Sequence, residues 1–448
     1  MRQFFATAIM IVCIAFSFAH AETTVLDPGE GILSAAIELA QSGDVLVLNP
    51  GEYTESNLSE VNALGMPIDK KLTIKAADDA QERPVIRNLS APSGHPTKGV
   101  FFLMKDGANL TVQGLDFNGG DKDTTLFRSA YHIFTLDTDD GAVIEAIKIY
   151  DCYLHDVSDR IVEGDAEKYK GIFVTNDTLI CENSLISGCW DVFDYRRTTV
   201  KFFKVTNTTA WDLTKGGKGR ILRTGFPVDS LYVDHCTFNG NDHRYFQMKP
   251  DLAGFGGHMF KNLILANSSN KDGIQVADEP FTTVTNCLFW NINGSLVNLH
   301  EEAVVTDTMT ADPMFVDPDE GDFTLAEGSP AIGAADDGSA LGDPRWDPTA
   351  TAVENQEAKK ISDYQLRQNY PNPFNPVTTI SFHLAASDLT TLTIYNTVGQ
   401  AVKTVVDEHL NAGLHSVQFD ASELPSGLYI YHLQSGEFNT SKKMMLLK

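Results

Sequence analysis

The chain has 448 residues and a formal net charge of -26 at pH 7, with 34 Lys and Arg against 60 Asp and Glu. This acidity argues against nucleic acid as a partner, because binding to phosphates requires a basic surface. An acidic ligand would have to meet a local basic patch, since the overall field repels it. The length suits two domains, or one long solenoid with a tail.

The first 21 residues have the pattern of a cleaved signal peptide. Arg2 supplies a positive charge, residues 4–18 form a short apolar run, and Ala19-His20-Ala21 ends that run with small residues. The run is too short for a comfortable membrane span, and no later segment is long and apolar enough to cross a bilayer. We expect cleavage after Ala21 and no transmembrane segment in the mature form; an uncleaved anchor is the alternative.

The cysteines give no disulfide framework. Of the six, Cys13 leaves with the signal peptide, and the odd number that remains has no pair at the spacing of a zinc site. Pairing of Cys181 with Cys189 stays open as an alternative.

The mature chain begins with elements that suit the capped end of a solenoid. Residues 31–40 form a short amphipathic pattern with Leu33 and Ile37 on one face, which predicts a helix. A strand over residues 45–48 and a turn at 49–51 follow. An exposed end of a stacked core has to be covered, and this helix is suited to cover it.

From there to about residue 305, strand-like runs recur every ~22–30 residues, which is a solenoid period. Aligning the runs produces a column rich in Asn, whose amides suit a stacked turn with unusual backbone angles. The next column holds small residues that we interpret as buried fillers, with a metal or redox site as the alternative. The first column is Asp151, Asn183, Asn207, His235, Asn262 and Asn286; the second is Cys152, Ser184, Thr208, Cys236, Leu263 and Cys287.

These repeats resemble the pectate-lyase-like family of parallel β-helices over roughly residues 25 to 345. The closing stretch, with residues 312–317, 321–323 and 328–333, is similar to the end piece of secreted bacterial β-helix proteins, including the chondroitinase-B and alginate-lyase group. The resemblance implies a right-handed parallel β-helix and specifies the reaction poorly. The Arg-x-Pro-x-x-Arg arrangement of pectate lyases and the calcium pattern of the chondroitinase-B group are both missing, so no catalytic residue is carried over.

The last eighty or so residues form a separate module. Residues 369–376 read Asn-Tyr-Pro-Asn-Pro-Phe-Asn-Pro, alternating strands follow, and the chain ends in Lys-Lys-Met-Met-Leu-Leu-Lys. This tail resembles the type A C-terminal sorting domain of the type IX secretion system, which implies a secreted or cell-surface attached protein that engages that machinery. A generic immunoglobulin-like sandwich that binds glycan or spaces domains is the alternative.

The expected fold class is therefore all-β: a right-handed parallel β-helix followed by a small immunoglobulin-like β-sandwich. The expected domains are a signal peptide over 1–21, the β-helix over 22–345, a linker over 346–363 and the sorting domain over 364–448.

One set of predicted strands collects basic residues in successive coils. The strands are residues 191–197, 219–225, 244–251, 273–279 and 296–302, and the last two carry Asp278, Glu279, His300, Glu301 and Glu302. On so acidic a chain this clustering is informative, although exposed cations often serve only solubility. The cations are Arg196, Arg197, Lys218, Arg220, Arg223, Arg244 and Lys249.

This patch contains the residue types that a uronate lyase needs. The enzyme has to neutralise the uronate carboxylate, remove the proton at C5 and protonate the leaving oxygen. Arg223 and Arg220, or calcium, would meet the carboxylate; Lys249 or Lys218 would be the base; Tyr245 or His243 would be the acid. Substrate binding is assigned to Arg196, Arg197, Lys218, Arg244 and Trp190.

The sequence therefore predicts a lyase that cleaves an acidic, uronate-containing polysaccharide by β-elimination. A hydrolase of the polygalacturonase kind would use Asp pairs, for which Asp191 and Asp194 are the nearest candidates and Asp336-Asp337 lies too late. A non-catalytic glycan-binding protein or adhesin is the other alternative, with aromatic residues near the basic coils to stack on sugar rings. These aromatics are Trp190, Trp211, Tyr195, Phe226 and Tyr245.

Overall fold

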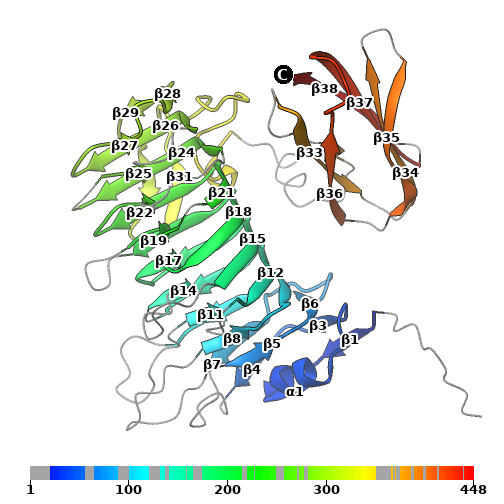
Figure 1. Ribbon diagram of the computed structural model, residues 1–448. Helices are drawn as coiled ribbons and strands as arrows, with labels where there is room; N and C mark the ends of the chain where they lie inside the picture. The colour runs from blue at the N-terminus through cyan, green and yellow to red at the C-terminus, as the bar shows by residue number, and fades with distance from the viewer. Residues whose placement is uncertain are drawn as a thin grey trace, which may run out of the picture. The chain divides into compact units, whose positions relative to one another are not determined.

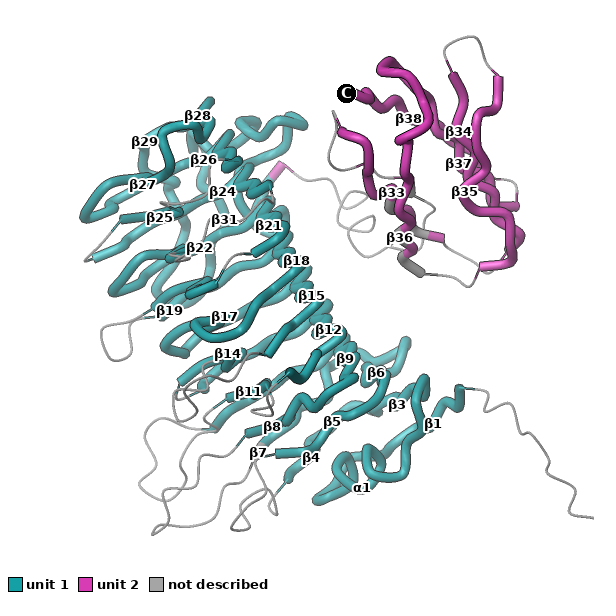
Figure 2. The backbone as a smooth tube through the Cα atoms, viewed as in Figure 1, with its two compact units in different colours: residues 1–348 teal, residues 349–448 magenta. Residues whose placement is uncertain are grey.

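The computed structural model divides the chain into two units, residues 1–348 and residues 349–448, and each is described by itself (Figure 2). The signal peptide, Lys218, Lys249 and most of the predicted linker lie outside the described residues. The structure describes residues 21–55, 65–88, 100–120, 132–136, 141–157, 159–164, 174–213, 219–226, 228–248, 257–269, 272–276, 281–349, 365–366, 369, 374–384, 388–396, 400–410, 413–436 and 438–447.

The first unit is a parallel β-solenoid, which confirms the predicted fold (Figure 1). Helix α1 (Ile32–Leu39) buries Leu33 and Ile37 at the N-terminal end of the stack, as expected. The first strands of the solenoid pair in parallel: β1 (Thr23–Leu26) with β3 (Val45–Leu48), and β3 with β6 (Lys71–Ala76). The helix therefore covers the core where no further coil can.

Two sheets build the coils. The first, here called the wide sheet, has twenty strands in the described residues. Besides β1, β3 and β6 it contains β2 (Gly29–Glu30), β4 (Glu52–Glu55), β7 (Val85–Asn88), β9 (Asn109–Gln113), β10 (Asp116–Asn118), β12 (Val143–Tyr150), β13 (Tyr153–His155), β15 (Val174–Glu182), β16 (Leu185–Ser187), β18 (Thr198–Thr206), β19 (Thr209–Leu213), β21 (Val228–Asp234), β22 (Thr237–Asn241), β24 (His258–Ser268), β26 (Thr282–Ile292), β28 (Val304–Thr306) and β29 (Met309–Thr310).

The second, here called the narrow sheet, has nine parallel strands in the described residues, one from each coil. Its last five fall within the five strands predicted from the sequence to carry the basic residues. The strands are β5 (Met66–Ile68), β8 (Val100–Met104), β11 (His132–Leu136), β14 (Arg160–Glu163), β17 (Asp191–Tyr195), β20 (Leu222–Thr224), β23 (Phe246–Met248), β25 (Ile274–Val276) and β27 (Val297–Leu299).

The Asn-rich column forms the bend between the strands of the wide sheet. All six members have left-handed backbone, with φ between 48° and 55°. Asn and Asp tolerate this region better than other residues with a side chain, because their short polar groups bond locally. The amide of Asn207 also donates to Asn183 Oδ1 at 3.0 Å. The predicted stacked turn is thus confirmed in both backbone and side chain.

A second left-handed column lies one short strand further along each coil and was not predicted. Asn267 donates to Asn239 Oδ1 and Asn291 donates to Asn267 Oδ1, both at 2.8 Å. Glycine replaces the polar residue in two coils, which hid the repeat in the sequence. The column is Asp156, Gly188, Asp212, Gly240, Asn267 and Asn291.

The five described cysteines are buried and free, so pairing of Cys181 with Cys189 is wrong. Cys152, Cys236 and Cys287 lie in the filler column, where neighbouring coils place Ser184 and Thr208, which are also fully buried. Burial raises the pKa of Cys152 to about 12, which keeps the thiol protonated. These sulfurs act as small core fillers, as the sequence predicted.

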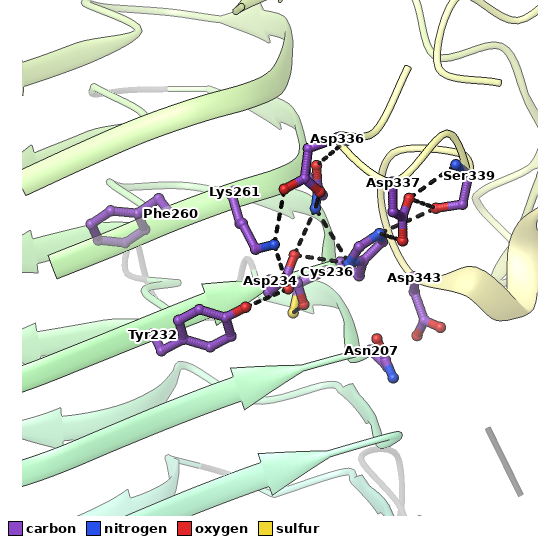
Figure 3. A network of polar contacts seen from close by, with 12 residues as sticks. Asn207, Tyr232, Asp234, Cys236, Phe260, Lys261, Asp336, Asp337, Ser339 and Asp343 are labelled. Atoms are coloured by element: carbon purple, nitrogen blue, oxygen red, sulfur yellow. Dashed lines mark hydrogen bonds and ion pairs between the residues drawn. The ribbon is translucent and has the colours of Figure 1, made fainter. Parts of the chain in front are cut away.

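A segment that we call the C-terminal strap, residues 329–347, lies over the Asn-rich column and bonds to coil after coil. It follows the hairpin of β30 (Phe315–Asp317) and β31 (Asp322–Leu325) and includes the short 3-10 helix η1 (Pro344–Trp346). Figure 3 shows Asp336 beside Lys261, at 3.1 Å, and Asp337 beside Ser339. Trp346 Nε1 donates to Thr209 Oγ1 at 2.7 Å, so the strap extends into the predicted linker.

Asn262 joins the strap to the coils through several hydrogen bonds. Its amide donates to Asp336 Oδ1 at 2.7 Å and to Asp234 Oδ1 at 2.9 Å, and its Oδ1 accepts the Asp336 backbone N–H at 3.0 Å. Its backbone carbonyl accepts the N–H of Gly342 at 2.9 Å. Asn262 is fully buried and Asp234 nearly so, and replacing the amide would take this donor from Asp234 with little access to water. The exposed Asp336 would also lose its two bonds to the amide, but it can be solvated.

Replacing Asn262 should therefore lower the free energy of unfolding in two separable steps. We expect about 2 kcal/mol for Asn262→Gly, which keeps the left-handed backbone but loses the amide bonds, and about 1 kcal/mol more for Asn262→Ala. Urea unfolding followed by circular dichroism measures both. Asn286→Gly is the matched control, since its amide reaches the strap through a single 3.3 Å bond to Ala334. Equal losses at Asn262 and Asn286 would contradict this account of the strap.

The second unit contains two antiparallel sheets around one core, in agreement with the predicted sandwich. Phe382, Ile394 and Tyr431 are fully buried between the sheets. Among the residues described in either unit, no helix is long and apolar enough to cross a membrane. One sheet is β32 (Gln365–Leu366), β33 (Val377–Leu384) and β36 (Gly413–Asp420); the other is β34 (Asp388–Asn396), β35 (Ala401–Leu410), β37 (Gly427–Ser435) and β38 (Phe438–Leu446).

Candidate functional site

From β11 onward, each described strand of the narrow sheet presents one polar residue at the same strand position, and we call this column the polar row. Core residues flank it on each strand: in β17, Phe193 and Tyr195 are fully buried on either side of Asp194. Side chains at one register position of a parallel sheet stack about 4.8 Å apart and point the same way. The polar row is Thr135, Glu163, Asp194, Arg223, Gln247, Gln275 and Asn298.

Its N-terminal part is a closed network centred on Arg160. The Arg160 guanidinium contacts Asp194 Oδ2 at 2.9 Å and Asp159 Oδ2 at 3.1 Å, and it also donates to Glu163. Burial alone would lower the pKa of Arg160, but the surrounding carboxylates, Glu163 first, raise it above its usual value. Arg160 is thus a permanent cation that holds the carboxylates of two adjacent coils together.

The next coil pairs its charges in the same way. Asp194 is fully buried and accepts Arg196 Nε at 3.0 and 3.1 Å. Asp191 is also fully buried and meets Arg220 Nη1 at 3.3 Å through both oxygens. Two of the predicted cations therefore balance buried carboxylates of the scaffold.

Arg223 differs from these arginines. Asp194 precedes it in the polar row, yet no hydrogen bond or ion pair joins Arg223 to another residue that the structure describes. Burial and the nearby guanidinium groups of Arg196 and Arg220 lower its pKa, which outweighs the attraction of the carboxylates. A half-buried guanidinium repelled by its neighbours and lacking a partner of its own is suited to accept an anion from outside.

Carboxamides continue the polar row beyond Arg223. Gln247 and Gln275 pair in register with it on β23 and β25. The Oε1 atom of each is buried and has no hydrogen-bond partner among the residues that the structure describes. Gln275 is 6% exposed, so this unsatisfied group lies at a place where it would normally cost stability.

One group of described residues has metal-ligating atoms close together: His132, Asp159 and Glu163, within 4.8 Å of one another. Arg160 donates to both carboxylates, and His132 Nε2 lies 3.5 Å from each of them. Calcium binds six to eight oxygen ligands, and these oxygens already serve a guanidinium. The donor set therefore does not fit calcium.

The structure brings some of the predicted site residues together and separates others. Arg196, just after β17, and Arg220, just before β20, lie near Arg223 of β20, whereas Arg244 pairs with Asp272 at 3.1 Å. Arg197, His243 and Trp190 are partly exposed on the same coils. Lys218 and Lys249 lie outside the described residues.

Tyr245 was predicted to act at the surface, but the structure places it in the core. It is fully buried in the solenoid core, and its hydroxyl donates to the backbone carbonyl of Ala266. Burial raises its pKa far above the usual value for tyrosine. A hydroxyl bonded inside the core cannot protonate a polymer outside it, so Tyr245 is removed from the candidate acids.

The groups put forward for the alternatives have structural roles too. Asp191 and Asp194 are each fully buried and bound to arginine, unlike a pair that activates water. Trp211 stacks on Tyr153, with ring centroids 6.1 Å apart, and packs edge-on against Phe323. The fully buried Tyr195 is equally unavailable to a sugar ring.

Sequence reasoning missed four members of the site: Arg160, Glu163, Gln247 and Gln275. Arg160 and Glu163 escaped notice because β14 was not identified as a strand of this sheet. The glutamines carry no charge, and charge was the sequence feature that marked this sheet. Aligning the coils at the position of Arg223 places Glu163, Gln247 and Gln275 in one row with it, and Arg160 lies three residues before Glu163.

Comparisons with known proteins match two parts of the chain to protein families. The family described as Domain of unknown function (DUF5123) matches residues 231–346, which run from β21 to the end of the C-terminal strap. The Secretion system C-terminal sorting domain matches residues 368–447. This confirms the predicted sorting tail, and the protein is secreted or attached to the cell surface. A search of curated proteins found no match.

Two solved structures of the PL6 family alginate lyase AlyGC, one of them an arginine-to-alanine mutant, are similar to the solenoid. The mutant has a TM-score of 0.41 and 16% identity, and the other structure has 0.38 and 14%. Each match covers 66% of this chain and 40% of the lyase, so this chain aligns with less than half of that enzyme.

Proposed function

We propose that the protein is an exported polysaccharide lyase that cleaves an acidic, uronate-containing polymer by β-elimination on the narrow sheet. The observation that carries the proposal is Arg223, a half-buried guanidinium with no described ion-pair partner, placed beside arginines that are already paired. The sorting domain supports a polymer substrate, because such substrates are met outside the cell.

The chemistry assigns a different task to each group. Arg223 would bind the uronate carboxylate and withdraw charge from it, which makes the C5 proton easier to remove. Lys249 or Lys218, which lie outside the described residues, would take that proton. His243, which is partly exposed beside the site, would protonate the leaving oxygen in place of Tyr245. Arg197 and Trp190 remain candidates for contacts with the rest of the polymer.

A binding protein without turnover is the second candidate. The same feature favours it, since Arg223 needs only an anionic sugar to satisfy it and the described residues do not include the lysine base. The two candidates differ in whether a bond of the polymer breaks.

Ultraviolet absorbance of the full chain mixed with alginate, pectate, hyaluronan and chondroitin or dermatan sulfate, with and without calcium, tests the proposal. We expect absorbance to rise on at least one polymer, from the new C4–C5 double bond. New reducing ends without that rise would instead indicate a hydrolase. Binding without any change in the polymer would establish the glycan-binding candidate, and the absence of both would overturn the proposal.

A further inference from the structure

Asp194 is the carboxylate that Arg223 would be expected to bind. The two residues pair in register on β17 and β20, so their side chains lie one coil apart on the same face of the narrow sheet. Asp194 attracts the Arg223 guanidinium, against the repulsion from Arg196. Nevertheless, no ion pair joins Asp194 to Arg223 in the part of the chain that the structure describes. The reason lies in the groups that already occupy Asp194.

Arg196 occupies Asp194 from the end of the same strand. Its Nε donates to Oδ1 of Asp194 at 3.0 Å and to Oδ2 at 3.1 Å, and its backbone N–H donates to Oδ1 at 3.3 Å. Arg160 contacts Oδ2 from the preceding coil at 2.9 Å. A carboxylate offers about four lone-pair positions, so these contacts leave Asp194 little capacity for a third guanidinium.

We propose that Arg196 is a positioning residue, which occupies Asp194 and repels Arg223 and thereby keeps the Arg223 guanidinium available to the uronate carboxylate. This rests on the proposed function, since it assigns the uronate to Arg223. In this role Arg196 acts through Asp194 and Arg223, which differs from the direct contact with substrate that the sequence predicted.

Removing the Arg196 side chain reverses both effects. Asp194 is fully buried, so after the loss of one guanidinium partner its charge could not be solvated by water. Arg223 faces it from the next coil and would no longer be repelled by Arg196. A charge-assisted bond between Asp194 and Arg223 would then form, and it would compete with an anionic ligand for the same guanidinium.

Arginine labelling with phenylglyoxal, followed by peptide mass spectrometry of the full chain, tests this step without any polymer. We expect the labelling rate of Arg223 to fall at least about tenfold in Arg196→Met, because a guanidinium held by a charge-assisted bond has to break that bond before it reacts. Arg83→Met is the control, since it changes a pair of the wide sheet and should leave the labelling rate of Arg223 unchanged.

A suppressor variant distinguishes this role from a structural one. Adding Asp194→Asn to Arg196→Met should restore the labelling rate, because the freed carboxylate is then absent. Arg160 keeps Asp159 and Glu163 as partners in the double variant. If thermal unfolding shows that Arg196→Met does not fold, Arg196→Gln carries the same expectations, since its amide still donates to Asp194 but no longer repels Arg223.

Affinity electrophoresis through gels that contain alginate, pectate, hyaluronan or chondroitin sulfate measures the effect on ligand binding. On each polymer that retards the unmodified protein, Arg196→Met should weaken binding at least about tenfold, and the double variant should bind within about threefold of the unmodified protein. A double variant that binds as weakly as Arg196→Met would assign Arg196 to direct contact with the polymer and overturn the proposal.

Equal labelling of Arg223 in the unmodified protein and in Arg196→Met would also overturn the positioning role. Failure of the proposed function has a different signature, because Arg223→Ala would then bind every polymer as the unmodified protein does. In that case the labelling rates still decide whether Arg196 keeps Asp194 away from Arg223.

Discussion

Replacing Arg223 by alanine should lower the rate of product formation on the cleaved polymer at least a hundredfold and leave the folded state intact. The loss is expected because a group that stabilises charge in the transition state of acyl or proton transfer is typically worth a factor of about 10²–10³. Stability should not fall, since removal of Arg223 breaks no ion pair with a described residue and relieves repulsion from Arg196 and Arg220. Initial rates by ultraviolet absorbance and thermal unfolding measure the two effects.

Two further variants show whether the effect depends on the guanidinium itself. Arg223→Lys keeps the charge but loses the planar fork, so we expect activity between that of the unmodified protein and that of Arg223→Ala. Arg83→Ala is the matched control, because Arg83 pairs at 2.6 Å with the exposed Asp151. Asp151 lies in the bend of the wide sheet, not on the narrow sheet. Full activity of Arg223→Ala would move the site elsewhere on the protein.

The parts of the fold that the sequence predicted are those fixed by local chemistry. Asn183, Asn207 and Asn262 could be aligned because each coil needs a left-handed residue at the same turn, and few side chains tolerate that backbone. The second turn column was harder to see, since Gly188 and Gly240 serve the same backbone need without a side chain. Amide ladders are thus visible in a sequence only while most coils use the same residue type.

The sequence predicted that three arginines lie on adjacent coils, but not how each is paired. Placing Arg196, Arg220 and Arg223 on adjacent coils followed from the repeat. Which of them is bound to a carboxylate depends on where Asp191 and Asp194 point, and sequence spacing does not state that. Tyr245 was misassigned for a related reason, because position in a strand does not by itself say which face is buried.

The contacts of the C-terminal strap could not be predicted from the sequence. Its contacts join residues far apart in the chain, such as Asp343 with Thr209 at 2.8 Å, and they follow no repeat. The matched family spans both the last coils and the strap, which agrees with the two forming one structural unit. The resemblance of the closing stretch to other β-helix end pieces signalled that a cap was present, without showing what it covers.

Replacing Arg160 by methionine should lower the free energy of unfolding, whereas replacing Arg223 should lower activity without lowering stability. Methionine keeps much of the volume but leaves Asp194, Asp159 and Glu163 without their shared cation, and Asp194 is fully buried. Breaking a buried ion pair by removing one partner costs about 3–5 kcal/mol, since the remaining charge stays desolvated. Chemical unfolding should show this loss, whereas Arg83→Met, which removes a partly exposed pair, should cost about 1 kcal/mol or less.

A double-mutant cycle separates the charge network from packing. If Arg160 acts by neutralising carboxylates, Glu163→Gln should be less damaging in the Arg160→Met background than alone, because it then removes one of the uncompensated charges. Additive losses would assign the effect to packing of the arginine stem. Measurement would then distinguish two arginines of one sheet. Removal of Arg160 destabilises the solenoid and lowers activity only through folding, whereas removal of Arg223 leaves the fold stable and slows the reaction.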